Sequence, residues 1–582
     1  MDDTNSLIEQ RKAKLAALRA KGIDPFKNKF TPAESCADAR KNYAEGREVA
    51  LAGRITAHRD MGKSMFMDIR DQSGRIQIYA QKNVLGDEQW NLFTHLDLAD
   101  FIGVRGTMFT TKTNEISVKI TGFVILAKAL RPPPAKWHGL EDTEIRYRQR
   151  YLDLMANPEV KDVFLKRSQI IAEIRNFLHS RGFVEVETPM MQAIPGGAAA
   201  QPFKTHHNAL GCDFYLRIAL ELPLKRMLVG GVDKVFEIGR VFRNEGLSRK
   251  HNPEFTMLEA YQAFGDYESM MELVQSMICH VAQKVLGTLK IERPQQKDQV
   301  AFVSNSVVQL IKDGIFESLS NSARLGNLKK IRGQIWTIGK SIQLENSDSY
   351  EVAGEMIKVI EEIINTLRNE LKGMDTVSAG GTSFLIWELK KNHRMFVSLS
   401  QKTIDLTPPW KTTKYKDLIR EAARPDWFDI TPLERKSFAN SLGAEIGKEY
   451  EDFEVTGAVF EKSIEPVLIQ PTFVTHLPKE LVPLAKVSPD DPSCVEVFEC
   501  CINGQEIAPG YTEQNNPIEQ RERLEHQAGG EQQKLDEDFL IALEHGMPPA
   551  GGIGIGIDRL CMMLLGQESI RDVILFPQLK PK

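Results

Sequence analysis

Hydrophobic residues change their spacing near Glu144, and this change divides the chain into two parts. Before it, apolar residues alternate with polar ones in short runs broken by glycines, which is typical of β-strands. After it, they recur mainly every three or four residues, as in amphipathic helices, with strand-like runs between them. The pattern predicts an α+β protein in which a small all-β domain precedes a larger mixed domain.

Residues 5–21 are predicted to form a basic helix that ends at Gly22 and Pro25. Its apolar positions near one face are Leu7, Ile8, Leu15 and Leu18. The lysines and arginines on the remaining surface of the helix could lie along the phosphates of a nucleic acid. A solvated surface helix has the same pattern. This helix and the lead-in after it occupy residues 1–45.

Residues 46–130 are predicted to form a five-stranded barrel of the OB type. Five short strands separated by glycines within about 80 residues are typical of Greek-key barrels. The expected strands are 48–57, 64–70, 75–80, 101–110 and 115–126. A linker at residues 131–150 follows, and its three consecutive prolines make it stiff.

Residues 151–297 and 403–582 are predicted to form one α+β domain. It begins with a helix at 163–181 and an alternating strand at 182–189, and helix and antiparallel-strand patterns then continue. Residues 298–402 interrupt this domain.

The interrupting segment is predicted to be a small inserted α+β domain. Ser349–Lys372 has a continuous apolar face and is expected to be a helix that Gly373 ends. Three strands are expected at 334–342, 383–389 and 395–399. No chemical motif occurs in this segment, so the sequence assigns it no role.

The composition narrows the class of protein. A chain of 582 residues with 42% hydrophobic and 26% charged residues is expected to contain several globular domains. The net charge of −5 provides no overall basic field, so a nucleic acid would need a local patch. Seven cysteines without a CxxC pair predict no zinc site and a reducing cytoplasm. No secretion signal or membrane span is expected.

A strand–turn–strand pattern surrounds Arg243-Asn-Glu245 and the run His251-Asn-Pro-Glu-Phe255. A buried arginine at the lip of such a hairpin can bind phosphate or carboxylate through two parallel hydrogen bonds. An aromatic side chain at the far end can stack on a nucleobase. The alternative is a hairpin whose charges only face water.

Glycine and isoleucine alternate from Gly552 to Asp558-Arg559. Such a strand has one bare face, on which a flat ligand can lie directly against the backbone. A closely packed strand–helix junction is the alternative.

Glu499 and Glu506 flank the turn Ile502-Asn-Gly504. Two carboxylates that face a triphosphate repel it unless a hard cation lies between them, and Mg²⁺ prefers this combination of ligands. Without the neighbouring motifs, two glutamates would carry no prediction.

These segments resemble motifs 2 and 3 of the class II aminoacyl-tRNA synthetases. Among these enzymes, their residues resemble those of the lysine–tRNA ligases. FRNEG followed by HNPEFTMLEAY resembles motif 2, and residues 552–559 resemble motif 3. The helix at 163–181 with its strand resembles motif 1. The resemblance covers 1–295 and 403–577 and leaves out 298–402. It implies an OB-fold anticodon-binding domain, a class II catalytic domain built on an antiparallel sheet, and a homodimer formed through motif 1.

The resemblance implies two catalytic arginines. Arg243 would hold the ATP α-phosphate and the amino-acid carboxylate, and Arg559 would contact the terminal phosphate of bent ATP. Glu499 and Glu506 would bind Mg²⁺. The other implied ATP contacts are Glu245, His251, Asn252, Phe255, Glu499 and Gly556, with Phe255 stacked on adenine.

Three acidic residues point to a cationic amino acid, because a buried ammonium group needs carboxylate partners. By resemblance, Glu513 and Tyr261 take the ε-ammonium group of lysine, Glu221 takes the α-amino group, and Glu259 supports them. The implied lysine-binding residues are Gly197, Glu221, Glu259, Tyr261, Tyr511 and Glu513.

Three positions depart from the family pattern. Pro509 replaces the usual asparagine, which helps to hold the substrate carboxylate, and proline offers neither an amide side chain nor a backbone N–H. Gln514 replaces a leucine, and Pro223 replaces an aromatic residue. These changes concern the amino-acid pocket and leave the ATP site unaltered.

In the barrel, Phe66, Gln77 and Glu115 lie where related enzymes read the anticodon. OB barrels bind single-stranded bases by stacking and by hydrogen bonds to base edges. Ordinary strand residues would fit the same positions.

The implied reaction attaches L-lysine to the 3′ end of tRNA(Lys) through a lysyl-adenylate made from ATP. One alternative is a sister enzyme for aspartate or asparagine, which the three pocket carboxylates disfavour. A second is a relative that transfers lysine to a protein, which the barrel disfavours. A third is a non-catalytic RNA-binding relative, which the complete ATP site disfavours.

Overall fold

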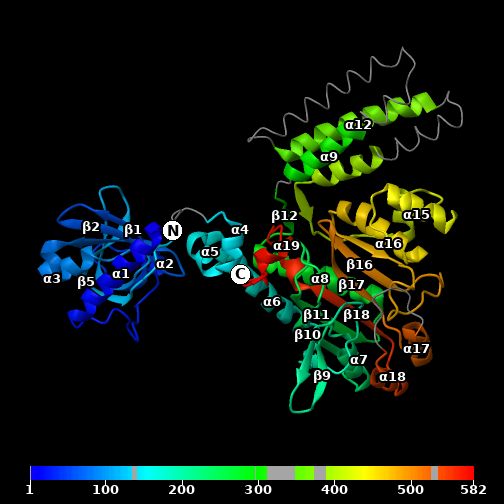
Figure 1. The fold of residues 1–582 in the computed structure, drawn as a ribbon, viewed down its shortest axis with the longest axis horizontal. Helices are drawn as coiled ribbons and strands as arrows, with labels where there is room; N and C mark the ends of the chain where they lie inside the picture. The colour runs from blue at the N-terminus through cyan, green and yellow to red at the C-terminus, as the bar shows by residue number, and fades with distance from the viewer. Residues whose placement is uncertain are drawn as a thin grey trace. The chain divides into compact units, whose positions relative to one another are not determined.

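The computed structural model describes residues 2–133, 140–294, 297–310, 348–371, 389–525 and 535–581 (Figure 1). The chain folds into two compact units that divide between Pro158 and Glu159. No helix among these residues has the length and apolar composition that crossing a membrane requires.

The first unit contains a closed five-stranded barrel in the order β1-β2-β3-β5-β4, as the alternating pattern predicted. Its strands are β1 (Glu48–Asp60), β2 (Ser64–Arg70), β3 (Arg75–Gln81), β4 (Phe101–Thr110) and β5 (Ile116–Ala127). Its helices are α1 (Asp2–Ala20), α2 (Cys36–Lys41), α3 (Lys82–Thr94), α4 (Thr143–Arg148) and α5 (Arg150–Ala156). Inward-facing side chains such as Leu51, Ile69 and Ile78 are fully buried and form the barrel core.

Helix α1 forms as predicted, but part of its basic face is used inside the unit. Arg11 is buried and donates to the carbonyl oxygens of Ala129 and Arg131, both at 3.0 Å. Lys14 forms an ion pair with Asp97 at 2.6 Å. These two cations therefore bind groups at the end of the barrel, Arg11 as a buried residue and Lys14 as a half-buried one.

The second unit is built on an eight-stranded sheet in the order β14-β15-β16-β17-β18-β11-β10-β6. Its inner strands are antiparallel, and the pairs at the two edges, β14 with β15 and β6 with β10, are parallel. The strands are β6 (Val184–Glu185), β10 (Lys234–Phe242), β11 (Glu254–Ala263), β14 (Lys411–Lys414), β15 (Thr472–Thr475), β16 (Val497–Ile502), β17 (Gln505–Thr512) and β18 (Ala550–Gly556).

Helices cover one face of this sheet (Figure 1). Side chains at alternate strand positions, such as Leu258 and Ile555, pack there against apolar side chains from these helices. The covering helices are α6 (Pro158–Ser180), α8 (Tyr267–Leu286), α19 (Ile557–Leu564) and α20 (Ile570–Val573).

Among the residues that the structure describes, helices cover the opposite face only at its two ends. At one end lie α7 (Glu221–Val229) and α18 (Glu537–Glu544), and at the other end α14 (Tyr415–Ala422), α15 (Pro432–Ser441) and α16 (Asp452–Ser463). The remaining short elements of this unit are η2 (Glu465–Val467), α17 (Pro517–Glu525) and a small sheet of β7 (Met191–Gln192), β8 (Lys204–His207) and β9 (Cys212–Leu216). The middle of the face is left for the cavity described below.

The strand of motif 1 is shorter than predicted. Only Val184–Glu185 pairs in the large sheet, parallel to β10, although alternation extends from 182 to 189. Thr188 instead bonds to the Glu237 carboxylate through its N–H and its hydroxyl. The chain therefore leaves the ladder before Pro189.

The described part of the inserted segment is helical. It contains α9 (Lys297–Leu310), α12 (Ser349–Leu371) and a helix at 389–399, which bury Val303, Met356 and Phe396 together. The predicted strand at 395–399 is wrong, because Phe396 and Leu399 are buried at helical spacing. The predicted strand at 334–342, and all of 383–389 except Leu389, lie outside the described residues. A two-stranded ribbon, β12 (Lys290–Glu292) with β13 (Thr403–Asp405), joins the segment to the rest of the unit.

Candidate active site

Arg243 lies at the lip of the β10–β11 hairpin, as the motif predicted. Its N–H donates to the Pro253 carbonyl oxygen at 2.8 Å, which closes the loop. Its guanidinium group lies 5.3 Å from the centre of the Phe255 ring. The only hydrogen bond that its guanidinium makes to the described residues is a long one, 3.4 Å, from Nε to the Ile218 carbonyl oxygen. Burial lowers the pKa of Arg243, so this arginine is a desolvated cation with most of its donors available for an anion.

Arg559 comes from the first turn of α19 and reaches the same space. One guanidinium nitrogen donates to the Glu506 carbonyl oxygen at 3.2 Å, and the other lies 3.0 Å from His251 Nε2. Burial, together with the charge of Arg559, lowers the pKa of His251. A neutral imidazole can accept this hydrogen bond, and His251 thereby helps to orient the arginine.

Asp558 holds the three motifs together, a role that the sequence comparison did not identify. Its carboxylate accepts from the Thr256 N–H at 2.7 Å and forms an ion pair with Arg167 of α6 at 2.7 Å. Asp558 thus ties α19 to β11 and to the helix of motif 1. The adjacent Asp-Arg pair at the start of a helix was the available signal.

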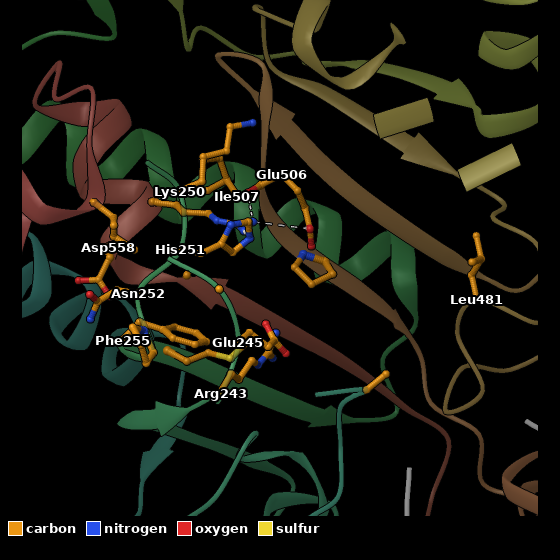
Figure 2. Close-up of a pocket in the computed structure, with 18 residues that line it drawn as sticks. Arg243, Glu245, Lys250, His251, Asn252, Phe255, Leu481, Glu506, Ile507 and Asp558 are labelled. Carbon is orange, nitrogen blue, oxygen red and sulfur yellow. Dashed lines mark hydrogen bonds and ion pairs between the residues drawn. The ribbon is translucent and has the colours of Figure 1, made fainter. Parts of the chain in front are cut away.

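These residues surround a cavity of about 430 Å³ (Figure 2). The predicted ATP contacts that line it are Arg243, Glu245, His251, Asn252, Phe255, Gly556 and Arg559, and Glu506, predicted as a ligand of Mg²⁺, lines it as well. Glu499 is not among the lining residues. Lys250 also lines the cavity, and its ammonium group donates to the Gly504 carbonyl oxygen at 2.9 Å. Side chains from three distant parts of the chain therefore converge on one space.

Glu499 and Glu506 lie on adjacent strands of the β16–β17 hairpin. Burial, with the charges of Glu506 and Glu465, holds the pKa of Glu499 well above its ordinary value. Burial also raises the pKa of Glu506, although Arg559 opposes this shift. Neighbouring carboxylates that resist ionisation in this way are stabilised by a bound cation.

Within the described ranges, no three or more histidine, cysteine, aspartate or glutamate side chains are grouped as a complete metal site. A Mg²⁺ ion held by one or two carboxylates takes its remaining ligands from water and phosphate. The glutamate pair beside an anion-binding cavity fits such a partial donor set.

The predicted lysine contacts form a buried cluster next to the cavity. Glu259 and Tyr511 each follow a cavity residue, Met257 and Pro509 respectively, by two positions on the same strand face. The Tyr261 hydroxyl donates to Glu259 at 2.8 Å, and the Tyr511 hydroxyl donates to Glu221 at 2.8 Å. The cluster is closed in this structure and does not line the 430 Å³ space.

Two glycines make room in this cluster. Gly197 has a φ of +85°, and a Cβ atom there would lie 3.1 Å from the Cβ atoms of Ala219 and Glu221. At Gly552, a Cβ atom would lie 2.0 Å from a carboxylate oxygen of Glu513. The bare face of β18 is therefore occupied at Gly552 by the pocket carboxylate, whereas Gly556 lines the cavity.

Lys225 is the pocket residue that the motif comparison missed. Its side chain is fully buried, and its ammonium group lies 2.6 Å from Glu221 and 2.5 Å from Glu513. The spacing of Glu221 and Lys225, four residues apart on one helix, was the only signal in the sequence.

The three departures from the family pattern lie in different places. Pro509 lines the cavity and pairs with Glu499 across the hairpin. Gln514 is buried, and its side-chain oxygen accepts from the Asn516 N–H at 3.0 Å. Pro223 lies within the first turn of α7, a position that tolerates proline.

In the barrel, Phe66 belongs to a row of aromatic side chains. Its ring centre lies 4.6 Å from that of Tyr79, which lies 5.8 Å from that of Phe109. Gln77 is buried and accepts from the Ser117 hydroxyl at 2.8 Å. Glu115 forms an ion pair with Arg40 at 2.9 Å. Tyr79 and Phe109 were missed, although alternation in β3 and β4 places them on the outward face.

Comparison with known proteins agrees with this arrangement. The family model described as tRNA synthetases class II (D, K and N) matches residues 142–318 and 341–580, and the model of the OB-fold nucleic acid binding domain matches residues 49–126. The first match includes most of the inserted segment, which corrects the prediction that the resemblance leaves out 298–402. That segment contains no catalytic motif, so motifs alone could not extend the resemblance through it.

Full-length relatives are found among proteins named "Lysine--tRNA ligase". The protein from Pelotomaculum thermopropionicum is 43% identical over all of this chain and 96% of its own length. The protein from Carboxydothermus hydrogenoformans is 42% identical over all of this chain and 99% of its own length. The Bacillus subtilis protein is 39% identical, with 100% and 98% covered.

Proposed function

This chain belongs to the lysine–tRNA ligases, a branch of the class II aminoacyl-tRNA synthetases, and we propose on that premise that it attaches L-lysine to tRNA(Lys) at the site built by Arg243, Arg559 and the Glu499–Glu506 pair. One observation carries the assignment of the site. Two arginines from motifs 2 and 3 line one cavity, which adjoins a buried cluster of three carboxylates. The cavity suits a nucleotide, and the cluster suits a cationic amino acid.

In the first step, a carboxylate oxygen of lysine attacks the ATP α-phosphorus, and the bond to the bridging oxygen of pyrophosphate breaks. The lysine carboxylate is already ionised, so no protein base is needed. Arg243 binds this carboxylate and the α-phosphate together, which brings two anions into contact. Arg559 neutralises the departing phosphates. Catalysis is therefore positioning and charge stabilisation by preorganised cations.

Adenosine is expected to lie between Phe255 and the bare face of β18 near Gly556. The Phe255 ring already has the Arg243 guanidinium near one side, so an adenine on its other side would complete a stack. Glu245, His251 and Asn252 supply polar groups around the base and the phosphates.

Mg²⁺ fits the Glu499–Glu506 pair, and when bound it neutralises phosphate charge and orients the phosphates. Lys250 bridges Glu465 and the Gly504 carbonyl oxygen at 3.3 and 2.9 Å, which holds the turn between the two glutamates. Lys250 thus holds the backbone of the turn that connects the strands of the two glutamates.

In the second step, the 3′-hydroxyl of the terminal tRNA ribose attacks the lysyl carbonyl carbon, and AMP leaves. The barrel would present Phe66, Gln77 and Glu115 to the anticodon. The Phe66–Tyr79–Phe109 row gives a stacking surface for unpaired bases.

A homodimer is proposed from the surface near motif 1. Large apolar side chains lie exposed there: Leu165, Val184, Met190, Met191 and Ile194. Several large apolar side chains exposed near one motif suit a protein interface. Light scattering should give twice the mass of the 65.7 kDa chain, and a Met191→Glu substitution should shift the measured mass toward that of the monomer.

We also place the protein in the cytoplasm, where its seven free cysteines would stay reduced.

The decisive experiment is ATP–pyrophosphate exchange with each of the twenty amino acids, followed by charging of tRNA(Lys). Lysine alone should stimulate exchange. A different preferred amino acid would overturn the assignment of the pocket. Exchange with lysine but no charging of tRNA would favour the alternative in which lysine is transferred to a protein.

A further inference from the structure

A lysine of the protein itself lies inside the proposed substrate pocket. Lys225 projects from α7 one turn after Glu221, and its ammonium group lies 2.6 Å from Glu221 and 2.5 Å from Glu513. The Tyr511 and Phe539 ring centres lie 5.6 and 5.9 Å away. Lys225 and both of its carboxylate partners are buried, and Tyr511 is half-buried, so this ion pair is largely removed from water.

The charges of this cluster do not cancel among themselves. Glu221, Glu259 and Glu513 carry three negative charges when ionised, and Lys225 supplies one positive charge. Two negative charges remain uncompensated. Burial raises the pKa of Glu259 to about 7 and also raises that of Glu513, which agrees with a pocket that lacks positive charge.

Free lysine brings two ammonium groups, and its carboxylate is directed to Arg243. We propose that Lys225 is a positioning residue that balances the third carboxylate, so that the pocket matches a ligand with two ammonium groups; this inference rests on the proposed function. Without it, the pocket would hold one carboxylate too many, and a buried unpaired charge is strongly unfavourable. Lys225 also fixes the positions of the two carboxylates that meet the substrate.

The first test substitutes Lys225 by methionine, which keeps most of the volume and removes the charge. We expect the dissociation constant of lysine, measured by calorimetry, to rise at least about tenfold, while the dissociation constant of ATP changes little. Lys225→Arg should recover part of the affinity because it keeps the charge. Arg226→Met is the matched control: Arg226 lies on the same helix and pairs with Asp536 at 2.8 Å, outside the pocket.

The pH dependence should change as well. The titratable groups that face Lys225 are Glu221 on its own helix, Tyr511 from β17 and Glu513 directly after β17, and Glu259 with Tyr261 completes the cluster. In Lys225→Met, the excess charge is removed when a carboxylate takes up a proton. Lysine must then compete with that proton, so its affinity should fall more steeply than in the wild type as the pH decreases from about 8 to about 6.

A second comparison separates charge balance from a merely structural role. Glu513→Gln leaves Lys225 in excess, with too little negative charge for two ammonium groups. Adding Lys225→Met to it restores the balance, so the double variant should bind lysine several-fold more tightly than Glu513→Gln alone. A lysine that only holds α7 in place would make the double variant bind more weakly.

Each outcome has one meaning. Wild-type lysine affinity in a folded Lys225→Met variant, or weaker binding by the double variant than by Glu513→Gln, overturns the inference. If Lys225→Met alone does not fold, the comparison with Glu513→Gln decides, because the double variant removes both charges of the buried pair. Absence of lysine-dependent pyrophosphate exchange in the wild type would instead overturn the proposed function.

Discussion

Arg293 and Asn503 join the base of the inserted segment to the turn between Glu499 and Glu506. Arg293 Nε donates to the Asn503 side-chain oxygen at 2.8 Å, and its Nη1 donates to the carbonyl oxygens of Ser398 and Gln401 at 2.8 Å. Asn503 has a φ of +57° at the tip of the hairpin. One buried cation therefore ties a helical segment without motifs to the strand pair proposed to bind Mg²⁺.

Arg293→Met should destabilise the protein by about 2–4 kcal/mol, because three acceptors, one of them buried and two half-buried, lose a charged donor. Asn503→Gly should cost about 1–2 kcal/mol, since it loses the hydrogen bond but keeps the positive φ easily. Urea unfolding measures both. The double variant should lose less than the two single losses together. Strict additivity would show that the contact does not connect the two regions.

Arg243→Ala should lower the rate of lysine-dependent pyrophosphate exchange by about 10²–10⁴-fold. Its free energy of unfolding should change by less than about 1 kcal/mol, because the guanidinium makes only one long hydrogen bond to the described residues. Arg240→Ala is the control, since Arg240 lies on β10 three residues before Arg243 and its side chain is 40% exposed. A near-normal exchange rate in Arg243→Ala would contradict its catalytic role.

The raised pKa of Glu259 predicts that the stability of the ligand-free protein depends on pH. Burial, with the charge of Glu221, raises the pKa of Glu259 from 4.5 to about 7. The folded state therefore binds a proton that the unfolded state has lost, and stability falls as the pH rises from about 4.5 to about 7. Urea unfolding at pH 5 and pH 7.5 should show a difference of up to about 3 kcal/mol from this group.

Glu259→Gln should remove that part of the difference, and saturating lysine should reduce it in the wild type because an ammonium group stabilises the ionised carboxylate. If Glu259→Gln keeps the full pH dependence of the wild type, other groups are responsible for it.

Strong local patterns account for what could be predicted. The barrel strands alternate cleanly, so β2 and β4 have the predicted bounds. Alternation of glycine and isoleucine in β18 likewise predicts a strand with one face free of side chains. The error at 395–399 arose because the apolar pattern of only five residues fits both a strand and a helix. In the structure this segment is a helix that buries Phe396 and Leu399. Length and neighbours decide such a case, and neither is visible in so short a run.

Contacts between distant residues could not be predicted. Lys225 and Glu513 lie on different elements and come together only when α7 packs beside the end of β17. Asp558 meets Arg167 and Thr256 for a similar reason. Motifs identify groups that contact substrates, whereas Lys225 and Asp558 fix the positions of other residues. In the sequence they look like members of any ion pair.

Glu506→Gln should weaken the binding of ATP in the presence of Mg²⁺ and lower pyrophosphate exchange by about 10²-fold or more. Lysine binding should remain, because Glu506 lies on the cavity side and not among the carboxylates of the buried cluster. Calorimetry with each ligand separates the two effects. Glu506→Asp, which keeps the charge, should need a higher Mg²⁺ concentration for half-maximal exchange. Equal Mg²⁺ requirements in wild type and both variants would exclude Glu506 as a ligand of the ion.

Phe66→Ala should raise the KM for tRNA(Lys) in the charging reaction and leave lysine-dependent pyrophosphate exchange unchanged. Stacking of one base on an aromatic ring contributes about 1–3 kcal/mol, which corresponds to about 5–150-fold in KM. Phe26→Ala is the control, because Phe26 is an exposed aromatic residue of the same unit outside the row. An unchanged KM in Phe66→Ala would remove Phe66 from the anticodon surface, and a loss of exchange would show that the substitution disturbs more than the barrel.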